Sequence, residues 1–278
     1  MRVTQEIKGT GENPTLTWLE RTALDLGRFI NERETPKALQ RLYHQGFGKR
    51  WLHFCVKNLL HVEGLEIAKR LAPGRGVLMC ANHRSFFDQY LLSLILVRET
   101  DWARDLYFPV RSNFFYESLT GVAVNLLVGG GVMYPPIFRD PAKSELNRTA
   151  LDKVTEFLKS PGSVVGIHPE GTRGKGSDPY KLLPAQPGVG KVAMHARPTI
   201  LPVWINGLSN SFAGQVMTNF KRPITTDQRI VIVFGDPVDL GPLGDERPRP
   251  AVYKRVADHI LSHIARLGER ERQLRAKL

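Results

Sequence analysis

The pattern of apolar and polar positions changes near residue 61. From there on, short apolar runs alternate with longer amphipathic segments, which are typical of buried strands and of helices respectively. The pattern predicts strands near residues 62–66, 76–81, 105–110, 163–167, 199–205 and 229–235. It predicts helices near residues 86–97, 141–159 and 188–196. This alternation predicts an α/β fold, in which helices cover a mixed sheet.

Helical periodicity also flanks this region. Two helices are expected at 14–31 and 36–60, with Pro36 placed to open the second. A last helix is expected near 249–275, after a Pro- and Gly-rich stretch. We therefore expect three parts: an N-terminal arm and basic amphipathic helical pair at 1–60, an α/β domain at 61–240, and a linker with a C-terminal helix at 241–278.

The charge of the chain is strongly positive. Its 278 residues carry 39 Lys and Arg against 27 Asp and Glu, a formal net charge of +12. Such an excess indicates an anionic partner, which can be a nucleic acid, an anionic membrane surface or a phosphorylated small molecule. Between Pro36 and Val62 there is no acid, and the basic residues are Lys37, Arg41, Lys49, Arg50 and Lys57. Aromatic and aliphatic residues lie among them, which suits a membrane interface; alternatively the helices pack on the sheet and their charges are solvated.

Any membrane contact is expected to be peripheral. No apolar run approaches the roughly 18 residues of a spanning helix, and the polar N-terminus lacks the apolar segment of a signal peptide. The two cysteines, Cys55 and Cys80, are expected to be free thiols in a reducing cytosol.

The first candidate for chemistry is the stretch CANHRSFFDQ, residues 80–89. Ser85 and Asp88 fit a capping box that would start a helix at about Phe86. Alternatively, Asp88 folds back on His83, fixes the tautomer of its imidazole and allows the other ring nitrogen to take a proton from a hydroxyl. Because Ser85 can cap in both cases, the two interpretations are compatible.

The second candidate is GSVVGIHPEGTRGKG, residues 162–176, where a short strand runs into a loop with glycines and basic residues. Gly171 permits close approach of the backbone to a ligand, and Arg173 and Lys175 can clamp phosphate oxygens. The alternative is a solvated basic surface loop.

Spacing argues against several other sites. A P-loop ending at Lys175 or Lys191 would need glycine where Pro169 and Ala185 stand. There is no G-x-S-x-G elbow of a serine hydrolase. His259 and His263 have ligand spacing on a helix but no HExxH motif, so no metal is expected.

Taken together and in order, these stretches resemble the glycerolipid acyltransferase family, which includes the 1-acylglycerol-3-phosphate acyltransferases. NHRSFFD at 82–88 resembles the family's N-H-x4-D block. HPEGTR at 168–173 resembles its F-P-E-G-T-R block, with His168 in the place usually held by Phe. ILPVWING at 200–207 and FGDPVDL at 234–240 are similar to two later blocks. The resemblance covers about residues 60–240.

The resemblance implies the glycerolipid acyltransferase fold and an O-acyltransferase. A fatty acyl group would pass from acyl-CoA or acyl carrier protein to the hydroxyl of a lysophospholipid, first 1-acyl-sn-glycerol 3-phosphate. Alternative acceptors are glycerol 3-phosphate or another lipid. Neither a cofactor nor a metal is implied, and the enzyme would work at the cytoplasmic face of the membrane.

The resemblance also assigns roles to residues. His83 would be the general base and Asp88 its partner, supported by Asn82 and Ser85. Substrate binding would involve Glu170, Gly171, Thr172, Arg173 and Arg139. Arg139 is placed by a divergent segment, GGVMYPPIFRD, where a nearby arginine or none are the alternatives. The non-enzymatic alternative is a basic lipid-binding or nucleic-acid-binding protein; no nucleic-acid-binding motif is found, so no nucleic acid partner is expected.

Overall fold

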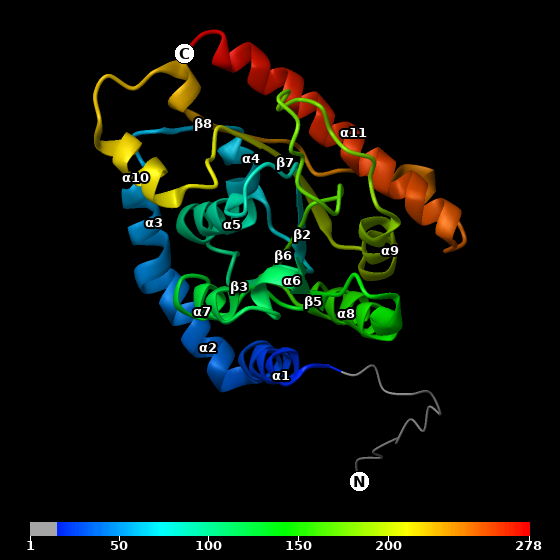
Figure 1. Ribbon diagram of the computed structural model, residues 1–278. Helices are drawn as coiled ribbons and strands as arrows, with labels where there is room; N and C mark the ends of the chain where they lie inside the picture. Colours follow the sequence, from blue (N-terminus) through cyan, green and yellow to red (C-terminus); the bar gives the residue numbers. More distant parts are fainter. Residues whose placement is uncertain (1–15) are drawn as a thin grey trace, which may run out of the picture.

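A six-stranded sheet lies at the centre of the computed structural model, which describes residues 16–278 (Figure 1). The expected arm at 1–13 lies outside the described residues. The strands of the sheet are β1 (Leu60–Glu63), β2 (Val77–Ala81), β3 (Asp105–Tyr107), β6 (Ser163–Ile167), β7 (Thr199–Asn206) and β8 (Ile230–Phe234). Their order is β1-β8-β7-β2-β6-β3; β7 and β8 pair antiparallel, and the other neighbours are parallel. The mixed sheet predicted from the apolar runs is confirmed.

Helices cover both faces of this sheet. In β2, Val77, Met79 and Ala81 face one core cluster, whereas Leu78 and Cys80 face the other. This alternation follows from the two-residue period of a strand. The first face is covered chiefly by α3 (Lys49–Val56) and α5 (Asp88–Glu99), and the second by α8 (Ser144–Phe157), α9 (Pro187–Ala196) and α11 (Pro250–Arg275). The helices expected near 86–97, 141–159, 188–196 and 249–275 are therefore present with small shifts of their ends.

Several elements were not predicted. The expected strand at 105–110 is divided between β3 and β4 (Val110–Arg111), and β4 pairs with β5 (Pro136–Ile137) in a separate two-stranded sheet. The helices that sequence reasoning missed are α4 (Leu65–Arg70), α6 (Ser112–Phe115), α7 (Leu119–Leu127) and α10 (Phe212–Phe220). These helices have nine residues or fewer, too short to display a clear helical period.

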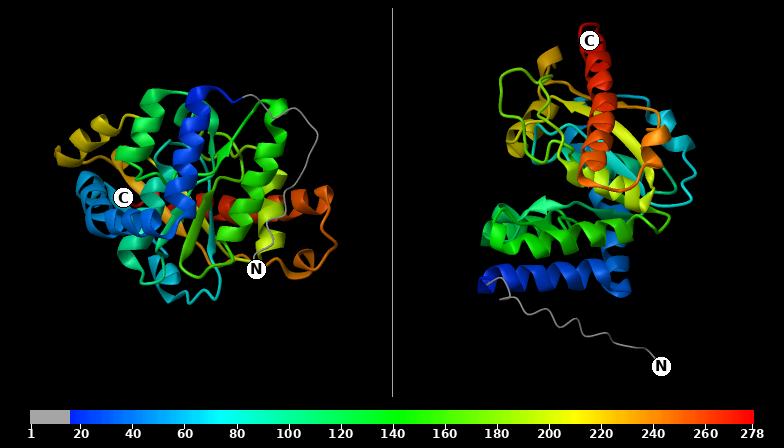
Figure 2. Two further views of the ribbon diagram at one scale, coloured as in Figure 1. Left: turned by 90° about the horizontal axis from the view of Figure 1, so that it is seen from below. Right: turned by 90° about the vertical axis from the view of Figure 1, so that its right-hand side faces the viewer.

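The N-terminal helices pack along one side and one end of the molecule. They are α1 (Trp18–Glu32) and α2 (Glu34–Tyr43), followed by a π-helical turn (His44–Gly48) that separates α2 from α3. Figure 2 shows α1 running alongside the layer that contains α8, and ion pairs join the two regions between Lys153 and Glu32 and between Lys143 and Glu20. Within residues 16–278, no helix combines the length and the apolar character needed to cross a bilayer.

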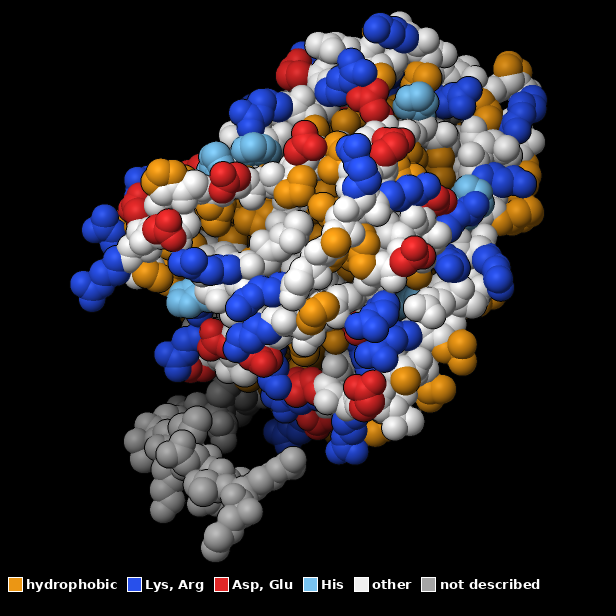
Figure 3. All heavy atoms as spheres, turned by 180° about the vertical axis from the view of Figure 1, so that it is seen from behind, with side chains coloured by type: hydrophobic (Ala, Val, Ile, Leu, Met, Phe, Trp, Pro, Cys, Tyr) orange, Lys and Arg blue, Asp and Glu red, His pale blue; other side chains and the backbone are white. Residues whose placement is uncertain are grey.

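Two of the five basic residues between Pro36 and Val62 bond to groups inside the protein instead of being free on the surface. Lys37 is only 3% exposed, because its ammonium donates to buried acceptors. Arg41 pairs with Asp105 at the start of β3. Basic side chains are also not confined to the N-terminal helices. On the face shown in Figure 3 they are spread widely, with acidic side chains among them.

Candidate active site

The two sequence motifs meet at one edge of the sheet. β2 and β6 are parallel neighbours, so the loops after their carboxyl ends, 82–87 and 168–186, lie side by side. Asn82 fixes the first loop, because its side-chain amide exchanges two hydrogen bonds with the backbone of Ile205 in β7, at 2.9 and 2.8 Å. Asn82 therefore attaches the loop that carries His83 to the neighbouring strand.

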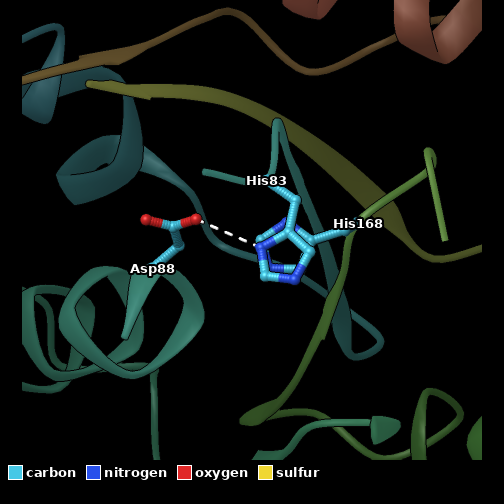
Figure 4. A group of neighbouring side chains, drawn as sticks. All are labelled: His83, Asp88 and His168. Atoms are coloured by element: carbon cyan, nitrogen blue, oxygen red, sulfur yellow. Dashed lines mark hydrogen bonds and ion pairs between the residues drawn. The ribbon is translucent and has the colours of Figure 1, made fainter. Parts of the chain in front are cut away.

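His83 and Asp88 lie in contact (Figure 4), with 3.2 Å between Nδ1 and Oδ2. The same Oδ2 accepts backbone N–H groups of Arg84 and Ser85, each at 2.7 Å. The Asp88 carboxylate thus holds the imidazole, as the second interpretation predicted, and also the backbone of the loop. The capping box of the first interpretation is wrong, because Phe87 is the N-cap residue and no side chain caps the helix. The helix begins two residues later than expected, at Asp88, and the Ser85 hydroxyl donates to the carbonyl of Ser209.

Burial sets the charge state of this pair. It raises the pKa of Asp88 to about 6, against the opposing effects of His168 and the two backbone hydrogen bonds. It lowers the pKa of His83 to about 4, assisted by the positive charge of Arg173. At neutral pH the imidazole is therefore uncharged and the carboxylate ionised. Nδ1–H then donates to Asp88, which leaves Nε2 as a proton acceptor.

A second imidazole stacks on the first. The rings of His83 and His168 lie 3.8 Å apart between centroids, at an interplanar angle of 9° (Figure 4). His168 Nδ1 donates to the carbonyl oxygen of Ala81 at 3.0 Å, which fixes the plane of its ring. Burial lowers the pKa of His168 to about 3, so the ring that packs on His83 is neutral. The sequence placed His168 in the motif but gave no sign of this contact.

Donor atoms of His83, Asp88 and His168 lie within 4.8 Å of one another, close enough to be considered for a metal ion. The two rings, however, lie in nearly parallel, separate planes, so their in-plane nitrogen lone pairs do not meet at one point, whereas tetrahedral zinc needs ligands that converge on it. The arrangement suits a hydrogen-bonded base.

Glu170 belongs to the second loop, and its side chain is only 2% exposed. One carboxylate oxygen accepts the backbone N–H of His83 at 2.9 Å, and the other accepts that of Leu183 at 2.7 Å. Both oxygens are thus used within the protein, and the carboxylate attaches the backbone of His83 to the second loop. Next to it, Gly171 is exposed and adopts a positive φ of 62°, a conformation for which glycine is suited.

Arginines surround the two loops. Arg173 donates to Asn210 at 2.6 Å and lies 4.2 Å from the ring centroid of Phe86. Arg84 donates to the carbonyl of Gly176, and Arg111 to that of Gly171, each at 2.7 Å. Thr172, like Arg173, is half-buried. A cluster of cations therefore borders the loop that carries the second motif.

Arg139 stands apart from this cluster in its contacts. It is exposed, follows the end of β5, and makes no hydrogen bond or ion pair within residues 16–278. Arg111, which the sequence analysis did not single out, sits on the strand paired with β5 and contacts the loop directly. The only sign of Arg111 in the sequence is its position directly after the apolar run at 106–110. Arg111 therefore joins Arg139 as a candidate anion ligand.

An apolar cavity of about 210 Å³ opens beside the first loop. It is lined by Phe86, Phe87, Tyr90, Phe114, Phe115, Val124, Val128, Gly129, Met133 and Asn210. Two of these residues follow His83 by three and four positions, and Asn210 also accepts from Arg173. The cavity thus lies between the loop that carries His83 and α7, with a polar group at its border.

Comparisons with known proteins identify the fold and the family. The fold is similar to the crystal structure of the 1-acyl-sn-glycerophosphate acyltransferase PlsC from Thermotoga maritima, with a TM-score of 0.51, 20% sequence identity and 90% of each chain covered. A search of curated proteins found no match. The acyltransferase family model matches residues 60–206, which is more than half of the chain and includes both motifs. The chain therefore belongs to the acyltransferase family, as the two motifs predicted.

Proposed function

We propose that the protein transfers a fatty acyl group from acyl-CoA or acyl carrier protein to the free hydroxyl of a lysophospholipid. The first candidate acceptor is 1-acyl-sn-glycerol 3-phosphate, and glycerol 3-phosphate is the alternative. The observation that carries the proposal is the His83–Asp88 pair, held with a neutral imidazole between an arginine-rich loop and an apolar cavity. An acceptor that joins a phosphate, a hydroxyl and an acyl chain matches these three features.

The reaction proceeds by direct transfer. His83 Nε2 takes the proton of the acceptor hydroxyl, and the oxygen attacks the thioester carbonyl of the donor. The tetrahedral intermediate collapses, the carbon–sulfur bond breaks, and the leaving thiolate receives the proton from His83. Asp88 stabilises the imidazolium that forms in between. No covalent acyl-enzyme is needed.

The surroundings position the two substrates. Arg173, with Arg111 or Arg139, supplies charge for the acceptor phosphate, since guanidinium groups bind phosphate oxygens in pairs. Glu170 and Gly171 shape the loop next to it. The acyl chain of the acceptor lies in the cavity lined by Phe86 and its neighbours. Burial of each methylene group against these apolar walls is favourable by about 0.8 kcal/mol.

The test is release of free thiol from palmitoyl-CoA with a panel of acceptors. We expect release that depends on the acceptor, and His83→Ala should lower it by about 10²- to 10⁴-fold, the usual contribution of a positioned base. His195→Ala is the matched control, because His195 is exposed on α9. A His83→Ala variant that keeps more than about a tenth of the activity contradicts the assignment. If thiol is released with another acceptor but not with lysophosphatidic acid, the acceptor is reassigned and the mechanism is kept.

We also propose that the protein binds peripherally to an anionic membrane, at its cytoplasmic face. Lys49 and Arg50 on α3 and Lys57 directly after it remain solvent-accessible. The same side of the molecule, at the left in Figure 1, exposes large apolar side chains of α2, the π-helical turn, α3, α7 and α10. They are Leu39, Leu42, Phe47, Phe54, Leu119, Leu127, Met217 and Phe220. Each cation near such a surface contributes about 1 kcal/mol, so the three supply roughly 3 kcal/mol of gross attraction.

Pelleting with vesicles tests this partner. Replacing Lys49, Arg50 and Lys57 with Gln should weaken pelleting with phosphatidylglycerol vesicles. The matched control replaces the exposed Arg247, Arg249 and Arg266, near or on α11, with Gln and so removes the same charge elsewhere. Equal pelleting of the two triple variants would refute a role for this face.

A further inference from the structure

The carbonyl groups at and directly after the end of α7 accept hydrogen bonds from side chains of the N-terminal helices and of the π-helical turn. The Tyr43 hydroxyl lies 3.1 Å from the Leu127 oxygen and 3.2 Å from the Val128 oxygen. Further donors follow in order: His44 Nε2 to Gly129 at 3.1 Å, Gln40 Nε2 to Gly130 at 2.8 Å and Asn31 Nδ2 to Gly131 at 2.8 Å. We call these four side chains and the carbonyls of 127–131 the carbonyl clasp.

A buried lysine orients the clasp. Lys37 Nζ donates to Asn31 Oδ1 at 3.0 Å, to Gln40 Oε1 at 2.6 Å and to the Leu106 carbonyl at 2.9 Å. An ammonium group has three donors and no acceptor, so it must face the oxygen end of each amide. The NH2 ends are thereby directed at Gly131 and Gly130. Since sequence separations within the clasp reach 100 residues, the clasp is a tertiary contact and not a helix cap of local origin.

The clasp holds a segment with little rigidity of its own. A helix ends with carbonyl groups that lack a partner inside the helix, and α7 is followed by Gly129, Gly130 and Gly131. Of these, Gly130 and Gly131 have positive φ values of 62° and 81°. Glycine loses more conformational freedom on ordering than any other residue. Without the clasp, the end of α7 would therefore fray.

This segment is also a wall of the apolar cavity. Val124, Val128 and Gly129 line it, and so does Met133, whose backbone N–H donates to Asn125 Oδ1 of α7 at 3.1 Å. Tyr90, which also lines the cavity, donates its hydroxyl to the Val128 carbonyl as well. If residues 127–131 shifted, the width of the cavity would change, because Val128 and Gly129 line it and their carbonyl groups are held by the clasp.

We propose that the N-terminal helices set the shape of the apolar cavity through the carbonyl clasp, so that Tyr43, His44, Gln40 and Asn31 determine which acyl chains the enzyme accepts. They are positioning residues, because they act through α7 and do not line the cavity. The inference rests on the proposed function in one respect: the occupant of the cavity is the acyl chain of a substrate.

The test compares Tyr43→Phe, which removes a hydroxyl and no bulk, with Tyr253→Phe as the matched control. Tyr253 lies on α11, and its hydroxyl contacts His195 at 2.8 Å, outside the clasp. The first readout is the ratio of kcat/KM for a lysophosphatidic acid acceptor with a palmitoyl chain to that for one with a decanoyl chain, with the same acyl donor for both. The second is hydrogen exchange of the backbone amides at residues 119–131. Gln40→Leu serves as a second, stronger variant.

We expect Tyr43→Phe to lower the ratio about three- to tenfold, the range of one hydrogen bond, and to speed exchange at 119–131. Tyr253→Phe should change neither. An unchanged ratio in both clasp variants overturns the inference, even if their stability falls. If wild-type protein transfers no acyl group, the proposed function fails by itself. The positioning role of the clasp is then decided by the exchange rates, and unchanged exchange in Tyr43→Phe and Gln40→Leu overturns it.

Discussion

Replacing Glu170 with glutamine separates two roles for this residue. The resemblance to the family assigns it to substrate binding, whereas both of its oxygens accept backbone N–H groups, of His83 and Leu183. Glutamine keeps the size but removes the charge and presents an NH2 group to one of these donors. A hydrogen bond to a charged group contributes about 1.5–3 kcal/mol. With one such bond lost and the other weakened, the free energy of unfolding should fall by about 2–3 kcal/mol.

The loss should also appear in catalysis, because the same bond holds the backbone of the proposed base. A displacement of about 1 Å can cost up to 10²-fold, so we expect kcat to fall by about ten- to a hundredfold with KM little changed. Urea unfolding and steady-state thiol release measure the two quantities, with Glu269→Gln, exposed on α11, as the matched control. An unchanged unfolding free energy together with a raised KM for the acceptor would refute the positioning role and favour direct substrate contact.

Other predictions concern the buried groups. Because the pKa of Asp88 is raised to about 6, kcat/KM should fall as the pH drops through that value and the pair takes up a proton; a level profile contradicts this. His168→Phe loses the hydrogen bond to Ala81 but keeps a ring that can stack on His83, so its activity should stay within tenfold of wild type. His168→Ala removes the ring and should lose more activity in the same assay. Equal losses in the two variants would count against a role for stacking. Lys37→Met removes one donor from each of three acceptors, of which Asn31 Oδ1 keeps a second donor in Gln40. It should destabilise the protein by about 3 kcal/mol in urea unfolding; unchanged stability would disprove the buried network.

The sequence predicted the features that depend on near neighbours. The apolar runs located all six strands of the main sheet, because the two-residue period and the length of a buried strand are local properties. The His83–Asp88 contact was predictable for the same reason, since a five-residue separation across a loop and a helix start brings the side chains together. The order of the two motifs was enough to indicate the family.

Tertiary structure decided which distant groups meet. Glu170 lies 87 positions after the backbone N–H that it binds, and His168 comes to stack on His83 only because β2 and β6 are neighbours. In the same way, Lys37 reads as a surface cation within a basic segment, yet it is buried against Leu106. Propensity and pattern record what each segment can form by itself. The partner that a side chain finds across the fold is fixed by strand order and packing, which no local stretch encodes.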